Sequence, residues 1–142
     1  MVVVKDETPY ANIELVLMEF LASLADTDTV VPPDGATALQ INRMAGEPDD
    51  GLTDYPRVRI LTYADDYLVA QKLAERVRQR LYTLDNGGTF TMAADGPDED
   101  LAGKVILFDT ARGDVPPENE AYPNPERTQV SGYYAFSLRR PN

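Results

Sequence analysis

The stretches Leu39-Gln40-Ile41-Asn42-Arg43-Met44-Ala45-Gly46 and Arg57-Val58-Arg59-Ile60-Leu61-Thr62-Tyr63 decide the fold of this chain. In each, apolar and polar residues alternate, which is the period of a β-strand with one buried face. Val58 and Ile60 share one face of the second stretch, and Arg57 and Arg59 share the other. Because a short acidic turn joins the two stretches, we predict strands over residues 38–44 and 57–63 that pair antiparallel.

Two further segments have the spacing of amphipathic helices. Apolar residues recur at helical spacing up to Leu24, and Thr8-Pro9 supplies a cap and a first residue, so we predict a helix over residues 9–24. A second helix is predicted over residues 65–84, with Asp65 as its cap. Its buried stripe is expected to be Ala70, Leu73, Ala74, Val77, Leu81 and Leu84, and its exposed side carries Lys72, Arg76, Gln79 and Arg80.

The remaining strands are predicted over residues 29–31, 89–93, 104–112 and 128–139, the last two as an antiparallel pair. This order predicts an α+β fold in which a mainly antiparallel sheet carries two helices on one face, in a single domain over residues 1–142. The other face, with Arg57, Arg59, Leu61 and Tyr63, is then expected to be open to water or a partner. The residues expected to be buried are Leu17, Phe20, Val58, Ile60, Leu73, Val77, Leu107 and Phe136.

The composition argues against an enzyme. The chain of 142 residues has no cysteine and no histidine, which removes the thiolate nucleophile and the commonest general base and metal ligand. No serine lies in a nucleophile elbow, and the acidic residues lie in predicted loops without apolar neighbours. We therefore expect no catalytic residue, no cofactor and no metal. The apolar runs are too short to span a membrane.

The net charge of −11 argues against a surface that grips nucleic acid. Acidic residues gather in segments 45–54, 95–100 and 114–126, which contain no Lys or Arg and each include Gly or Pro. These segments are predicted to be solvated loops. A calcium site in the first segment is the alternative, because clustered carboxylates suit hard cations, but the spacing does not match an EF-hand loop.

Charged and aromatic residues on predicted exposed positions are candidates for an interface. The basic side of the second predicted helix and the Arg-bearing strand face would suit acidic loops of a neighbouring copy. Tyr133 is expected on the same open sheet face, since Tyr134 points into the core. The predicted interface residues are Arg57, Arg59, Arg76, Arg80, Asp49, Asp50 and Tyr133.

The order of these parts matches one known family over most of the chain. The parts are the apolar helix Ile13 to Leu24, the strand ending Val31-Pro32-Pro33, the segment Leu39 to Arg43 with its Ala45-Gly46 pair, the acidic turn into Tyr55-Pro56-Arg57-Val58-Arg59-Ile60, the Ala- and Arg-rich helix 65–84, and the end Phe136-Ser137-Leu138-Arg139. In this pattern the chain resembles the tail terminator proteins of long-tailed, non-contractile phages, especially those of actinobacterial phages. It departs from them at Ala45-Gly46, where the family often has two glycines, and in the long segment 113–127.

The resemblance implies a structural virion protein that forms a hexameric ring at the tail–head junction, after assembly in the host cytoplasm. Such a ring caps the head-proximal end of the tail tube, ends tube polymerisation and joins tail to head. The implied partners are further copies of the chain, the tail tube protein and a head-side connector protein. DNA would pass through the pore without specific binding, and the acidic balance suits such a wall.

Two alternatives remain at this point. One is another neck or head-completion protein of the same virion. The other, from a different class, is a small acidic or calcium-binding domain of a host.

Overall fold

Strands β2 (Ala38–Met44) and β4 (Arg57–Ala64) pair antiparallel at the centre of the sheet, as predicted. In their register Ile41 lies opposite Ile60 and Met44 opposite Arg57. The structure is a computed structural model, and it describes residues 8–120 and 127–142. The alternation read from the sequence therefore fixes which side chains of the two strands share a face.

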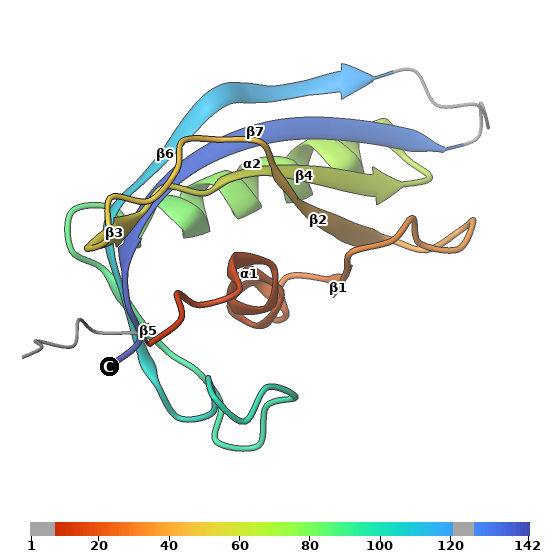
Figure 1. Cartoon of the computed structure of the whole chain (residues 1–142). Coiled ribbons are helices and arrows are strands. Elements are labelled where there is room, and N and C mark those ends of the chain that lie inside the picture. The colour runs from red at the N-terminus through yellow and green to blue at the C-terminus, as the bar shows by residue number, and fades with distance from the viewer. Residues whose placement is uncertain (1–7, 121–126) are drawn as a thin grey trace, which may run out of the picture.

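Within the described residues the sheet has seven strands, mostly antiparallel (Figure 1). Their order is β1-β2-β4-β7-β6-β5, with β3 paired to β7, and only β1 and β2 run parallel to each other. The α+β fold is thereby confirmed. The remaining strands are β1 (Asp26–Asp28), β3 (Thr53–Asp54), β5 (Thr89–Thr91), β6 (Val105–Glu120) and β7 (Thr128–Arg139).

The helices α1 (Ile13–Leu21) and α2 (Tyr67–Tyr82) pack on the same face of the sheet. Figure 1 shows α1 end-on and α2 lengthwise beside the long strands. One apolar cluster joins both helices to β2, β4, β6 and β7. On β7, Gly132 makes room for a neighbour, because a Cβ there would lie 3.1 Å from atoms of the Tyr134 ring and hydroxyl.

Both helices are shorter than predicted. Asn12, not Thr8, caps α1, because its side chain accepts from the amides of Glu14 (3.0 Å) and Leu15 (3.4 Å), and Asn is a stronger cap than Thr. The predicted helix over residues 9–24 is therefore wrong at both ends. Asp66 rather than Asp65 caps α2, because its side chain accepts from the amides of Leu68 (2.7 Å) and Val69 (3.4 Å).

The strand predicted over residues 29–31 is wrong, since the paired residues are Asp26–Asp28. The carbonyl oxygen of Thr29 accepts instead from the side-chain amides of Gln40 (3.4 Å) and Asn42 (2.8 Å). These side chains on β2 take the place of a backbone partner. The chain consequently leaves the sheet, and Val30 is 59% exposed.

Strand β6 is longer than the predicted segment 104–112, because it continues through Pro116 and Pro117 to Glu120. Register shifts after Gly113 accompany this extension. Proline lacks an amide donor, and it is tolerated here because β5 pairs only with Val105–Leu107, which leaves the rest of β6 without a second strand partner in the described chain. The predicted loop is thus a strand up to residue 120, and residues 121–126 lie outside the described chain.

Burial corrects two further predictions. Leu107 is half-buried, and its neighbours Ile106 and Phe108 point into the core instead. The other residues predicted to be buried are buried. The second sheet face is not open throughout, since Leu61 is 4% exposed and Tyr63 is 2% exposed.

Arg127 covers the second sheet face at its Tyr63 end. Its guanidinium lies 4.6 Å from the centre of the Tyr63 ring, and the Tyr63 hydroxyl donates to Gln40 Oε1 (2.9 Å). The same guanidinium donates to the carbonyl of Pro32 (3.0 Å), to the Asp34 carboxylate (3.1 Å) and to the carbonyl of Ala36 (3.4 Å). It thereby holds the turn over residues 32–36 against the sheet.

Leu73→Asp is expected to abolish soluble folding, because Leu73 is buried in the main core and an unpaired carboxylate there has no partner. Leu68→Asp is the matched control on the same helix, since Leu68 is 61% exposed. We expect the control to melt within a few degrees of wild type in circular dichroism. A Leu73→Asp protein that is soluble and melts like the control would contradict the core.

Candidate functional site

Charged surfaces are the candidate site in this chain. Among the described residues, no three acidic side chains gather in a group that would hold a metal ion. In the same part of the chain no helix has both the length and the apolar character needed to cross a bilayer. The predicted interface residues fall on the second sheet face, on α2, and in the loop before β3.

Arg57, Arg59 and Tyr133 come together on the second sheet face. Arg59 lies opposite Tyr133 in the β4–β7 register, and the Arg57 guanidinium lies 5.1 Å from the centre of the Tyr133 ring. All three side chains are half-buried. The predicted sharing of one face is confirmed, and the face presents cations beside an aromatic ring.

Arg76 and Arg80 differ in their surroundings, although both lie on α2. Arg76 is exposed. Arg80 donates from Nε to the carbonyl of Phe20 (2.8 Å), and its guanidinium lies 4.4 Å from the centre of the Phe20 ring. That carbonyl belongs to the last turn of α1, where helical carbonyls lack intrahelical partners. Arg80 therefore joins the two helices within one chain.

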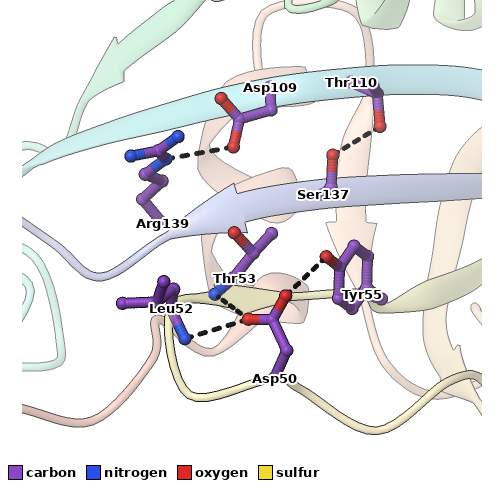
Figure 2. A network of polar contacts seen from close by, with 8 residues as sticks. All are labelled: Asp50, Leu52, Thr53, Tyr55, Asp109, Thr110, Ser137 and Arg139. Atoms are coloured by element: carbon purple, nitrogen blue, oxygen red, sulfur yellow. Dashed lines mark hydrogen bonds and ion pairs between the residues drawn. The ribbon is translucent and has the colours of Figure 1, made fainter.

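The Asp50 carboxylate organises the loop before β3 (Figure 2). It accepts from the amides of Leu52 (2.9 Å) and Thr53 (2.7 Å) and from the Tyr55 hydroxyl (2.8 Å). These donors, the Leu52 amide first, hold the pKa of Asp50 below its usual value of 3.8. The hydrogen bond from the Tyr55 hydroxyl to Asp50 raises the pKa of Tyr55. Asp49 accepts from the Gly51 amide (3.1 Å).

Asp54 is not the solvated acid that the sequence predicted. It is 4% exposed, and Arg43 donates to both of its oxygens, at 3.3 Å and 3.1 Å. The Tyr55 amide adds a third bond (3.1 Å). A signal for this pair was present, because Arg43 and Asp54 lie on either side of the predicted turn and carry opposite charges. The pair closes the loop at its base.

Arg140 is a further residue that sequence reasoning missed. It donates to the carbonyl oxygens of Thr8 and Gly51, the latter at 2.8 Å, and its guanidinium lies 4.4 Å from the centre of the Tyr10 ring. One side chain thus ties the segment before α1, the loop before β3 and the end of the chain. No local pattern marks it, because its partners are remote in sequence.

A hollow of about 310 Å³ lies between α1 and the segment 92–102. Its lining is mostly apolar, and two carboxylates, Glu19 and Asp98, belong to it. Glu19 accepts from the amide of Ala93, so α1 is joined directly to this segment. The apolar lining residues are Leu15, Met18, Met92, Ala93, Pro97, Leu101 and Ala102.

The sequence matches no protein-family model and no curated protein. The structure is similar to a chain of a solved structure described as the virion of a native gene transfer agent (GTA) particle. The match has a TM-score of 0.54 and 12% sequence identity, and it covers 87% of this chain and 84% of that chain. At this identity the match shows a shared fold, and it extends over most of both chains.

Removing the Asp50 carboxylate is expected to loosen the loop before β3. Because its pKa is lowered in the folded protein, its contribution to stability is present at neutral pH and is lost as the pH falls below 3.8. Asp50→Asn should therefore reduce the hydrogen-exchange protection of the Leu52 and Thr53 amides at neutral pH. Asp95→Asn, in another exposed loop, should leave the protection of both amides unchanged. Equal protection in the two variants would contradict this role of Asp50.

Arg80→Ala is expected to lower the free energy of unfolding by about 1–2 kcal/mol, because it removes a charged hydrogen bond and a ring contact between the helices. Arg76→Ala is the control and should change it by less than about 0.5 kcal/mol, as is usual for surface positions. Urea unfolding measures both. If the two variants are equally stable, Arg80 does not stabilise the contact between the helices.

Proposed function

We propose that this chain is a structural protein of a phage-like virion and that it serves there as the tail terminator. The single observation that carries the proposal is the fold shared with a chain of the gene transfer agent virion over most of both chains. The resemblance to tail terminators, noted from the sequence, narrows the virion role to this component. Neither argument depends on the other, because one uses the backbone and the other uses residue types.

Most of the features that carried the sequence resemblance occupy the framework of the fold, but the segment ending Val31-Pro32-Pro33 lies outside the sheet. The apolar helix is α1, the segment Leu39 to Arg43 is the core of β2, and the end Phe136 to Arg139 completes β7. The two departures from the family lie elsewhere. Ala45-Gly46 follows β2, and the described part of the long acidic segment forms the second half of β6, paired with β7 at the edge of the sheet. This distribution supports a common framework that differs in one connection and at one sheet edge.

A closed ring needs two different surfaces on each subunit that fit each other. The chain presents exposed cations on α2, at Lys72 and Arg76, and exposed acids in the segment 95–100. Individual exposed ion pairs contribute only about 0.2–1 kcal/mol, but a ring repeats each contact at every subunit boundary. In the proposed hexamer the net charge of −11 per chain would repel DNA phosphates from the pore. The tube protein and a head-side connector would bind its two ends.

Another neck or head-completion protein is the second candidate, because the match is to one chain of a virion structure that is described by its particle and not by the component. A terminator differs from these in controlling tail length. Loss of a neck protein would instead leave tails of normal length that are detached from heads. Electron microscopy of particles therefore separates the two roles.

Deletion of this chain is expected to give tails that grow past their normal length and fail to join heads. Arg76→Glu is expected to weaken capping in the same direction while leaving the fold intact, because Arg76 is exposed. The measurement is the distribution of tail lengths in negatively stained particles. Wild-type tails joined to heads in the full deletion would remove the terminator proposal, whereas normal-length free tails would favour the neck protein.

A further inference from the structure

The hollow beside α1 has the features of a receptor for a side chain from outside. Its floor is apolar and buried, since Met92 and Leu101 are each 5% exposed. Met18 and Ala102 are half-buried on its walls. A space of about 310 Å³ holds one or two large apolar side chains. The hollow is therefore matched to an apolar group that residues 8–120 and 127–142 of its own chain do not supply.

The rim of the hollow selects a basic partner. Asp98 and Glu19 line it, and the adjoining segment 95–100 adds three more acids and no base. Asp98 accepts from the Asp100 amide (3.0 Å), and this bond holds residues 98–100 in a turn at the rim. A carboxylate has two oxygens with several acceptor positions, so such bonds leave capacity for a cation. An apolar group followed by Lys or Arg fits this site.

The first turns of α2 carry this combination on the side away from the core. Leu68 is 61% exposed, and Lys72 and Arg76 follow it at intervals of four residues, so the three form one row on the helix. Glu75, beside this row, is engaged within the helix by Arg78 (3.4 Å) and Gln79 (2.9 Å). The row is therefore apolar at its start and positive beyond it.

The row and the hollow lie apart on the molecule. The residues of α1 that line the hollow are Leu15, Met18 and Glu19. On the other side of α1, Phe20 receives Arg80 of α2. The hollow thus opens on the side of α1 that faces away from α2, and the row cannot fill the hollow of its own chain. Two unlike, complementary surfaces on separate sides are the requirement for head-to-tail association.

We infer that the row Leu68, Lys72 and Arg76 of one copy docks into the hollow beside α1 of the next copy. Leu68 enters between Met18 and Ala102, and the two cations lie against the acids of the segment 95–100. This inference rests on the proposed ring and names the surfaces that close it. Arg80 has no part in this contact, because it is held by Phe20 within its own chain.

Thiol cross-linking tests the contact directly, because the chain has no cysteine and every engineered thiol is unique. Leu68→Cys and Ala102→Cys are made as separate variants, one of them isotope-labelled, then mixed at high concentration and oxidised. Mass spectrometry then distinguishes mixed disulfide dimers from dimers of one variant. We expect mixed dimers in clear excess over the statistical ratio. The control replaces Leu68→Cys with Leu52→Cys. Leu52 is 77% exposed in the loop before β3, and this control should give no excess of mixed dimers.

Self-association of the full chain provides a second measurement. Leu68→Asp should fold like wild type and lose self-association in light scattering, whereas Leu52→Asp should retain it. A statistical mixture of disulfides, or a Leu68→Asp chain that associates like wild type, overturns the contact. So does a wild-type chain that stays monomeric at millimolar concentration, together with Leu68→Cys and Ala102→Cys variants that form no mixed dimer.

The tail phenotype separates failure of this contact from failure of the proposed function. Overgrown tails in the full deletion together with normal tails in Leu68→Asp would remove only this contact. Normal tails joined to heads in the full deletion would remove the terminator itself.

Discussion

Strand β4 imposes the constraint on which the rest of the structure depends, because it is paired on both edges and most of its side chains are buried, on one face or the other. One face is covered by apolar side chains of the two helices. The other carries Gln40 and Tyr63 near one end of the sheet, where a polar layer closes over them. Arg127 supplies that layer, and its buried charge is acceptable because carbonyl and carboxylate oxygens surround it. The fold therefore has an apolar core on one side of β4 and a hydrogen-bonded one on the other.

Much of this architecture could be predicted from the sequence, because it depends on periodicity. Strands β2, β4 and β7 and the buried stripe of α2 follow directly from alternation and helical spacing. The errors arise where a remote partner overrides a local pattern. The valines at 30 and 31 are typical of a strand. The Asn42 side chain, however, donates to the Thr29 carbonyl, which a strand ladder would otherwise use. The prolines at 116 and 117 are typical of a loop, but they are tolerated at a sheet edge that has no second strand partner among the described residues.

The candidate site shows the same division between local and remote determinants. Arg76 and Arg80 are alike in sequence, and only the position of Phe20 in space distinguishes an exposed cation from a link between helices. Asp50 and Asp54 are likewise acids of one acidic segment, yet one organises a turn and the other is buried against Arg43. The sign of a charge can be read from a sequence, but its exposure cannot. The partner of each charge can be identified only from the folded structure.

The prolines of β6 also bear on how copies of the chain behave when they are crowded. A free strand edge with regular donors and acceptors is a template onto which another chain can add, and unlimited addition leads to fibres. Two successive residues without an amide donor interrupt that template on the long edge. At the opposite edge, β1 is short and carries Asp26 and Asp28, which repel the same residues of a second copy. Neither edge favours merging of sheets, so concentrated copies of the chain are expected to resist aggregation through their sheet edges.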